Sequence, residues 1–193
     1  MNIVPLDVDD VPSFVAHMRR HSLENGRDGD PIFMPFGKEQ PYDLDDATER
    51  RRRIWSAPLE SAEWGRAWGL RVQSEGMPAP RLGGHIELEG CFPPTAHHRV
   101  NMGMGIERPW RGRGQGVALL HTAIEWARAQ PFIRWVDLGV FAGNAPASAL
   151  YRRAGFSEIG RTPERFLVDG DAVEDISMTL FVGPKEERPR APG

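Results

Sequence analysis

Hydrophobic positions along the chain recur at two different spacings. Val11, Phe14, Val15 and Met18 follow one another at the i, i+3, i+4, i+7 spacing of an amphipathic helix. Residues 82–89 instead alternate between apolar and polar side chains, which is the period of a strand with one buried face. The sequence therefore predicts a domain that combines helices with a sheet.

Turn and cap signals divide the rest of the chain into the same two kinds of element. A proline in a first turn and a glycine just past a last turn mark helices, and the pair Asp169-Gly170 marks a hairpin. The predicted helices cover residues 11–18, 45–56, 114–129 and 145–154. The predicted strands cover residues 3–6, 66–72, 82–89, 100–107, 132–140, 157–168 and 173–182.

The order of these elements favours an α/β (α+β mixed) fold with helices on both faces of one sheet. Strand–helix–strand connections near the middle of the chain demand at least one parallel pair, because tight hairpins join only antiparallel strands. The 193 residues contain no internal repeat or dividing linker, so we expect one domain over residues 1–182. The tail over residues 183–193 is rich in proline and charge and is expected to be disordered.

Composition narrows the possible partners and compartments. The formal net charge of −3 gives no support for binding nucleic acid through phosphate neutralisation. Cys91 is the single cysteine, so no intrachain disulfide can form. The start is acidic where a signal peptide is basic, and no stretch approaches the roughly 18 apolar residues of a membrane span. We therefore expect a cytoplasmic protein with no membrane partner.

Several polar or apolar clusters are expected to have no catalytic role. His97 and His98 are adjacent and would point to opposite faces of a strand, so no metal site is predicted. The arginines at residues 50–53 are expected to form a solvated helix face. Residues 24–42 are predicted to form a loop, although Phe33, Met34 and Phe36 make it unusually apolar.

A glycine-rich turn is the strongest local signal for chemistry. Residues 111–116 read RGRGQG and lie between a predicted strand and a predicted helix. The first backbone N–H groups of a helix lack internal partners, and together with the helix dipole they attract an anion such as a phosphate or pyrophosphate. A P-loop would need Gly-Lys-Ser/Thr, and a Rossmann turn would need G-x-G-x-x-G, which differs from the G-x-G-x-G spacing here. A glycine-rich helix start without a ligand is the alternative.

A second signal covers residues 144–156, which read NAPASALYRRAGF. Asn144 and Tyr151 are seven positions apart, about two helical turns, so a helix that begins there directs both to one side. The alternative is that Tyr151 is a half-buried core tyrosine.

Together these two segments resemble the GNAT superfamily of N-acetyltransferases. The family pattern Q/R-x-x-G-x-G/A is matched by Arg111, Gly114 and Gly116. The later family positions are matched by Asn144, Ala147, Tyr151, Gly155 and Phe156. The ending VDGDAVEDISMTL is similar to the bacterial branch with ribosomal-protein and amino-acid acetyltransferases, and the resemblance extends over about residues 82–180.

The resemblance implies a single domain whose sheet is splayed at a parallel strand pair. It implies acetyl-CoA as co-substrate, with no metal, and an amine acceptor that attacks directly in a ternary complex. Tyr151 would protonate the departing thiolate or donate a hydrogen bond to it, and a homodimer is a family expectation. The residues that would bind the cofactor are Met104, Gly105, Ile106, Arg111, Gly112, Arg113, Gly114, Gln115, Gly116, Val117, Asn144, Ala147 and Tyr151.

The sequence identifies the group that accepts the amine proton less clearly than it identifies the cofactor site. Amines are mostly protonated at neutral pH, so a base or water must take a proton. The candidates are Glu87, Glu89, His85 and Glu107, of which we favour Glu87; a merely solvated polar face is the alternative. Cys91 has no evident activating base, so a cysteinyl intermediate is not expected.

Two functions are compatible with these motifs. The first is an N-acetyltransferase acting on a small amine, an amino acid or a protein N-terminus, with the oxyanion expected at a backbone N–H near Ile106. The apolar loop around residues 33–36 favours a small or partly apolar amine. The second is a non-catalytic acyl-CoA-binding sensor, which would keep the glycine-rich turn but need neither acid nor base.

Overall fold

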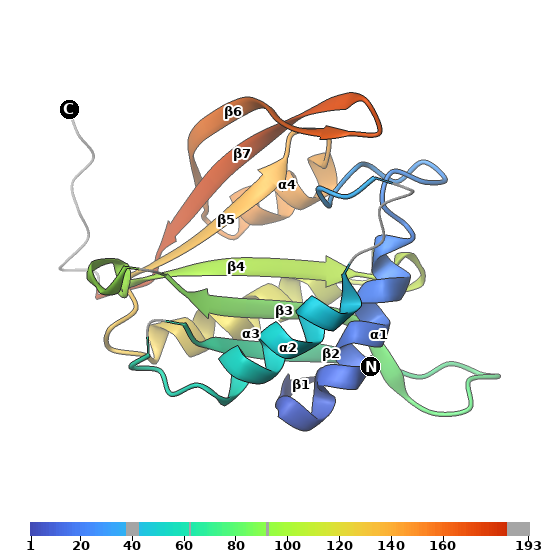
Figure 1. The fold of residues 1–193 in the computed structure, drawn as a ribbon, viewed down its shortest axis with the longest axis horizontal. Helices are drawn as coiled ribbons and strands as arrows, with labels where there is room; N and C mark the ends of the chain where they lie inside the picture. Colours follow the sequence, from blue (N-terminus) through green and yellow to red (C-terminus); the bar gives the residue numbers. More distant parts are fainter. Residues whose placement is uncertain (38–42, 62, 92, 185–193) are drawn as a thin grey trace.

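Seven strands form one sheet in a computed structural model that describes residues 1–37, 43–61, 63–91 and 93–184 (Figure 1). The strand order is β1-β2-β3-β4-β5-β7-β6, and every neighbouring pair is antiparallel except β4 and β5. The strands are β1 (Asn2–Leu6), β2 (Gly65–Val72), β3 (Arg81–Gly90), β4 (Arg99–Ile106), β5 (Trp135–Phe141), β6 (Ser157–Val168) and β7 (Asp171–Phe181). The helices of eight residues or more are α1 (Val11–Ser22), α2 (Leu44–Ser56), α3 (Gln115–Arg128) and α4 (Ala145–Arg153).

The predicted fold class and the order of its elements are confirmed. The mixed sheet contains a parallel pair, and the helical and extended periods of the sequence match the helices and strands to within a few residues. The predicted tail over residues 183–193 lies outside the described residues from residue 185 onward, as do residues 38–42 of the predicted loop.

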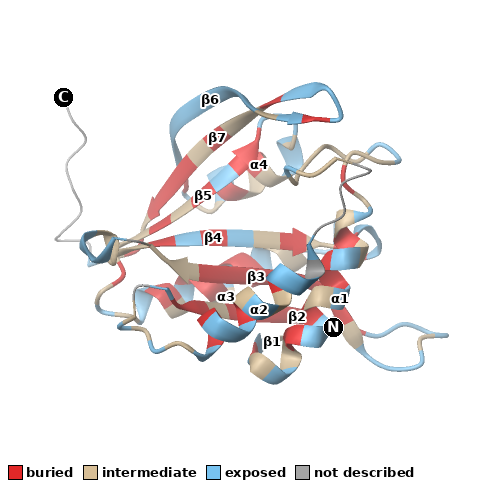
Figure 2. Ribbon diagram, in the orientation of Figure 1, coloured by how far each residue is buried: buried red, intermediate tan, exposed pale blue. Residues whose placement is uncertain are grey.

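Helices cover the two faces of the sheet in separate layers. α1 and α2 pack on one face of β2 and β3, where Phe14, Met18, Ile54 and Trp55 belong to one buried cluster. α3 packs on the opposite face, and its buried positions at helical spacing contact the main core that contains Ile86. Buried residues concentrate in the central strands, whereas β6 is mostly exposed (Figure 2).

The two halves of the sheet meet only briefly. β4 and β5 pair in parallel over three residue pairs, from Arg99↔Trp135 to Asn101↔Asp137, and then separate (Figure 1). At this junction the Arg99 guanidinium donates two hydrogen bonds of 2.6 Å to the Asp137 carboxylate and one of 3.1 Å to Thr179. One ion pair therefore ties β4, β5 and β7 together at the point from which the strands diverge.

Replacing Asp137 by alanine is expected to lower the free energy of unfolding by about 1–3 kcal/mol, because Arg99 loses a charged acceptor in a half-buried place. Urea unfolding measures this value. The matched control is Glu125→Ala, which removes an exposed ion pair with Arg128 on α3 and is expected to cost less than about 0.5 kcal/mol. Equal losses in the two variants would contradict a special role for the Arg99–Asp137 pair.

Candidate active site

A cavity of about 620 Å³ opens where β4 and β5 separate. Its walls are the free part of β4, the glycine-rich turn, α4, the end of β5, the end of α1 with the loop that follows it, and one residue of β3. Every residue predicted to bind the cofactor lines this cavity except Arg113. Two motifs that lie about 30 residues apart in the sequence thus face the same space.

The glycine-rich turn leads directly into α3. Gly112 and Gly114 have φ angles of 71° and 77°, in the left-handed region that favours glycine. A Cβ at either position would meet no atom within 4 Å, so positive φ is what these two glycines supply. The first helical hydrogen bond of α3 runs from Ala118 N–H to the Gly114 carbonyl, so the N–H groups of residues 115–117 have no partner within the helix.

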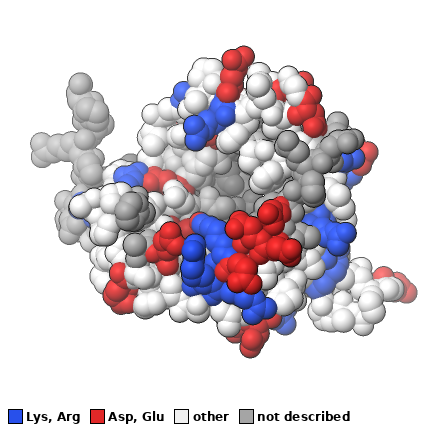
Figure 3. All heavy atoms as spheres, viewed as in Figure 1, with Lys and Arg blue, Asp and Glu red and all other residues white. Residues whose placement is uncertain are grey.

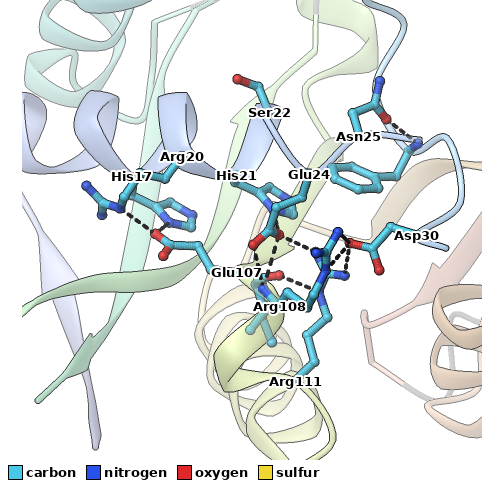
Figure 4. A network of polar contacts seen from close by, with 12 residues as sticks. His17, Arg20, His21, Ser22, Glu24, Asn25, Asp30, Glu107, Arg108 and Arg111 are labelled. Atoms are coloured by element: carbon cyan, nitrogen blue, oxygen red, sulfur yellow. Dashed lines mark hydrogen bonds and ion pairs between the residues drawn. The ribbon is translucent and has the colours of Figure 1, made fainter. Parts of the chain in front are cut away.

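The two arginines of this turn differ in their contacts. Arg111 donates to the Ile106 carbonyl and forms ion pairs with Glu24 and Asp30, the latter at 2.8 Å. The Arg113 guanidinium lies 5.6 Å from the centre of the Trp110 ring. Glu24 and Asp30 surround Arg108 and Arg111 in Figure 4. Arg111 is thus already paired, so an anion at this turn would be bound by backbone N–H groups, with the exposed Arg113 as the nearby positive charge.

The loop after α1 is held in place by one asparagine. The Asn25 side-chain oxygen accepts hydrogen bonds from Phe33 N–H and Met34 N–H at 2.7 and 2.9 Å, and its amide donates to the Met34 and Phe36 carbonyls. Phe33 and Met34 thereby line the cavity, and Phe33 stacks on His21 with 4.6 Å between the ring centres. Sequence reasoning missed His21, which lines the cavity from α1, and Asn25, which holds the loop that carries Phe33 and Met34, because only the fold brings these groups together.

Asn144 and Tyr151 both line the cavity from α4. The Asn144 side chain caps the helix by accepting a hydrogen bond of 3.3 Å from Ala147 N–H. Tyr151 is buried, and burial raises its pKa to about 12. Its hydroxyl group therefore keeps its proton at neutral pH and remains a hydrogen-bond donor.

Glu87 does not reach the cavity. Its carboxylate accepts hydrogen bonds from Arg51 at 2.9 Å and from the Trp55 ring N–H at 3.2 Å, both on α2. Burial raises the pKa of Glu87, and it does not belong to the cavity lining. The preference for Glu87 as the base is thus corrected, since both of its oxygens are used to bind α2.

The polar face of β3 is covered by α1 and α2, so that His85 and Glu87 are buried and Glu89 is only partly exposed. Glu89 forms a bidentate ion pair with Arg50, which explains part of the arginine run. Arg51, expected on a solvated helix face, is instead buried against Glu87. Alternation along β3 did identify the shared face of His85, Glu87 and Glu89, but their partners lie on helices distant in sequence.

His85 lines the cavity and is linked to two other buried groups. Its Nδ1 lies 2.9 Å from His17 Nε2, and His17 Nδ1 lies 2.9 Å from Glu107 Oε1. Glu107 was expected to be an exposed charge at a strand end, but it is 3% exposed and also binds Arg20 and Arg81. Figure 4 shows His17, Arg20 and Glu107 in this arrangement.

Burial and hydrogen bonds together set the protonation of these three groups. It lowers the pKa of His17, and it lowers that of His85 well below the ordinary histidine value. Burial alone would raise the pKa of Glu107, but hydrogen bonds from His17 and Arg81 hold that pKa below its usual value. At neutral pH the arrangement therefore contains an ionised carboxylate and two neutral imidazoles.

Comparison with known proteins assigns the family. The model of the acetyltransferase (GNAT) family matches residues 37–156. The chain belongs to the GNAT family. An L-amino acid N-acetyltransferase of Escherichia coli (strain K12), AaaT, is 29% identical over 95 residues, which are 49% of this chain and 59% of that protein. The matched region thus spans little more than half the length of that relative.

Solved acetyltransferase structures share the fold along nearly the whole chain. The structure of yncA from Salmonella typhimurium with its cofactor acetyl-CoA has a TM-score of 0.73 at 16% identity, covering 100% of this chain and 98% of that one. A ribosomal-protein-alanine N-acetyltransferase from Brucella melitensis has a TM-score of 0.69 at 22% identity, covering 94% and 99%. The predicted resemblance to a bacterial GNAT branch is confirmed at the level of family and fold.

The remaining features of this GNAT chain concern groups outside the cavity lining. Burial raises the pKa of the Cys91 thiol, which favours the uncharged and less reactive form.

Among the described residues, no group of three or more histidine, cysteine or acidic side chains is placed to hold a metal ion, and no helix is long and apolar enough to cross a membrane. Basic and acidic side chains lie next to each other on the face shown in Figure 3.

The free energy of unfolding is expected to fall as the pH is lowered from about 7.5 to about 5.5. Histidines of the unfolded chain take up protons near pH 6.5, whereas the folded protein keeps His17 and His85 neutral to lower pH because their pKa values are lowered. Below pH 6.5 the unfolded state therefore binds more protons and is favoured. The raised pKa of Glu87 acts in the opposite direction, but it is one group against two.

Urea unfolding at a series of pH values measures this dependence. Replacing the exposed His121 by asparagine is the control and should leave the slope unchanged. A free energy of unfolding that stays constant between these pH values would contradict the burial of two neutral histidines.

Proposed function

We propose that this chain transfers an acetyl group from acetyl-CoA to a primary amine of a small molecule, an amino acid or a protein N-terminus. The observation that carries the proposal is the cavity at the β4–β5 junction, which is lined by the N-terminus of α3, the free edge of β4 and Tyr151. Direct attack of the amine on the thioester within a ternary complex is the proposed route.

The start of α3 suits the diphosphate of CoA. Three consecutive N–H groups, on residues 115–117, have no partner within the helix and lie beside two glycines with positive φ. Gly116 also allows close packing, because a Cβ there would approach Leu150 to 3.1 Å. Residues 111–117 are therefore the proposed diphosphate site, through their backbone.

The free edge of β4 suits an extended chain with amide groups. Glu107 N–H donates to the Gly83 carbonyl on the β3 side, and backbone groups alternate in direction along a strand. The backbone groups of Met104 and Ile106 then point away from β3, toward the cavity. The pantetheine amides would pair with the backbone of Met104 and Ile106, as in an added strand. Gly105 would contribute by leaving space, because it has no side chain.

Acetyl transfer requires a C–N bond to form while the C–S bond breaks. The Ile106 N–H is the proposed donor to the oxygen that becomes negative during attack. Tyr151, which keeps its proton because burial raises its pKa to about 12, would donate a hydrogen bond or the proton to the departing sulfur. Asn144 and Ala147, on the first turn of α4, would flank the pantetheine arm.

The wall of the cavity opposite the glycine-rich turn suits a small acceptor with an apolar group. Met18, Phe33 and Met34 line it, and Asn25 fixes the loop that carries the last two. The E. coli relative is named as an L-amino acid N-acetyltransferase, which supports the α-amine of an amino acid as one class of acceptor.

Release of the free CoA thiol, measured against a panel of amines, tests the function and the acceptor class. Amino acids with apolar side chains are expected to exceed polar polyamines in kcat/KM by about 10-fold or more, since one or two methylene groups in an apolar pocket supply that discrimination. A preference for polyamines would contradict the proposed acceptor. Acetyl-CoA binding by calorimetry without turnover on any amine would instead favour the non-catalytic sensor.

The Tyr151→Phe variant is expected to lower kcat by about 100-fold, because general acid or hydrogen-bonding assistance to the leaving group contributes rate factors of this order. Its affinity for acetyl-CoA should change little, since the ring that packs on Phe156 is retained. Steady-state kinetics and calorimetry give the two values. Full activity in this variant would remove Tyr151 from the mechanism.

A further inference from the structure

Three side chains from distant parts of the sequence form one continuous hydrogen-bonded chain that ends at the cavity. Glu107 follows β4, His17 lies on α1 and His85 lies on β3. The Glu107–His17 and His17–His85 contacts are both 2.9 Å, and the three residues are 3%, 0% and 5% exposed. Such buried polar groups are costly unless each is paired, so the arrangement is closely constrained.

The charge on Glu107 decides which nitrogen of each ring carries a proton. An ionised carboxylate only accepts hydrogen bonds, and Arg20 and Arg81 help to keep Glu107 ionised. His17 Nδ1 must then donate, which leaves Nε2 of the neutral ring as an acceptor. His85 Nδ1 must donate in turn, so His85 Nε2 carries the free lone pair.

The free edge of the His85 ring lies over the part of β4 where the thioester is proposed. A methyl group added at Gly105 would approach His85 Cε1 to 2.9 Å, so only the missing side chain of Gly105 leaves room for the ring. Gly105 stands between Met104 and Ile106 and lines the same cavity as His85. Among the described residues, none forms a hydrogen bond with His85 Nε2.

We propose that His85 is the general base of the transfer and that His17 and Glu107 are positioning residues that hold its ring in the reactive tautomer. This inference rests on the proposed acetyltransferase function. The amine nitrogen attacks the thioester carbon, the C–N bond forms and the C–S bond breaks. One N–H proton passes to His85 Nε2, the departing sulfur takes a proton from Tyr151 or solvent, and solvent restores both groups.

The groups around His85 explain how it works as a neutral base. His17 and His21 face it from α1, Arg51 from α2, and Phe14 contacts it edge-on at 5.0 Å. Burial has the largest effect and lowers the pKa of His85. The charges of His17, His21 and Arg51 lower it further. The lone pair is thus available throughout the neutral range, and the ionised Glu107 stabilises positive charge that spreads to His17 through the hydrogen bond.

His21 is the rival that must be distinguished. It also lines the cavity, and its Nε2 would lie 2.6 Å from a methyl group at Gly105. Its Nδ1 contact with Glu24 is longer, at 3.3 Å, and the Glu24 carboxylate already accepts from Arg108 and Arg111. The structure therefore favours His85, whose tautomer is set by two short bonds.

The His85→Asn variant separates base catalysis from structure. The asparagine amide can still donate to His17 Nε2 from near the Nδ1 position, but it provides no basic nitrogen toward the cavity. We expect kcat/KM for the amine to fall by about 100-fold or more, as for loss of a general base, with acetyl-CoA affinity and Tm nearly unchanged. Matched His→Asn variants are His21→Asn, expected to lose less activity, and the exposed His121→Asn, expected to keep full activity.

The His17→Gln variant tests positioning through the pH profile. At the lower pH where His85 takes up a proton, His17 is already protonated, and its positive charge lowers the pKa of His85. An uncharged glutamine at position 17 should therefore raise that pKa. The His85 ionisation in kcat/KM, which lies below that of the amine, should then move to higher pH while kcat falls about 10-fold. A lower rate with an unmoved profile would show that His17 is merely structural.

The outcomes of these experiments separate the two proposals. Wild-type turnover together with near wild-type activity of His85→Asn, or a larger loss in His21→Asn, would overturn the assignment of His85 and leave the acetyltransferase function intact. Absence of wild-type turnover on any amine would reject the proposed function itself. If His85→Asn fails to fold, His85→Ala with added imidazole is the substitute: rescue of activity is expected, and a folded variant without rescue would overturn the assignment.

Discussion

The short parallel contact between β4 and β5 is the constraint on which the cavity depends. Only three residue pairs join the strands, and the Arg99–Asp137 ion pair holds them where the pairing stops. Beyond that point each strand keeps an antiparallel partner on its outer side, β3 or β7, so neither edge loses its support. An unpaired edge inside a fold is costly unless something satisfies its amide groups, and a ligand that extends along β4 would do so.

A second constraint acts across the sheet. Residues of β3 alternate between an apolar face that packs on α3 and a polar face that packs on α1 and α2. Charges under those helices are stable only when paired, as Glu87 is with Arg51. The same burial gives His85 a different character, because its partner is a second imidazole and the residue lines the cavity. Alternate positions on β3 thus differ in role: Glu87 stabilises the packing of α2, and His85 is the proposed base.

Local features predicted much of this architecture. The helical and extended periods, the proline in the first turn of α4 and the positive φ of Gly114 before α3 all depend on residues within one or two turns of each other. The same locality explains why the two cofactor motifs were recognised: each is a short stretch that begins a helix. The assignment of Glu87 as the base does not fit its position in the structure, for the opposite reason. No residue near Glu87 in the sequence indicates that Arg51 and Trp55 will bind it, because they lie on a helix more than 30 residues away.

The sequence by itself determined the fold class, the family and the backbone elements that surround the proposed thioester, since periodicity, caps and turns are properties of neighbouring residues. Only the tertiary structure decided which polar groups meet at the cavity. His17 lies 68 residues from His85 and 90 from Glu107, and their tautomers follow from hydrogen bonds made after all three elements pack. Burial and partner choice arise from long-range packing, and the protonation states on which the proposed catalysis depends follow from burial and partners.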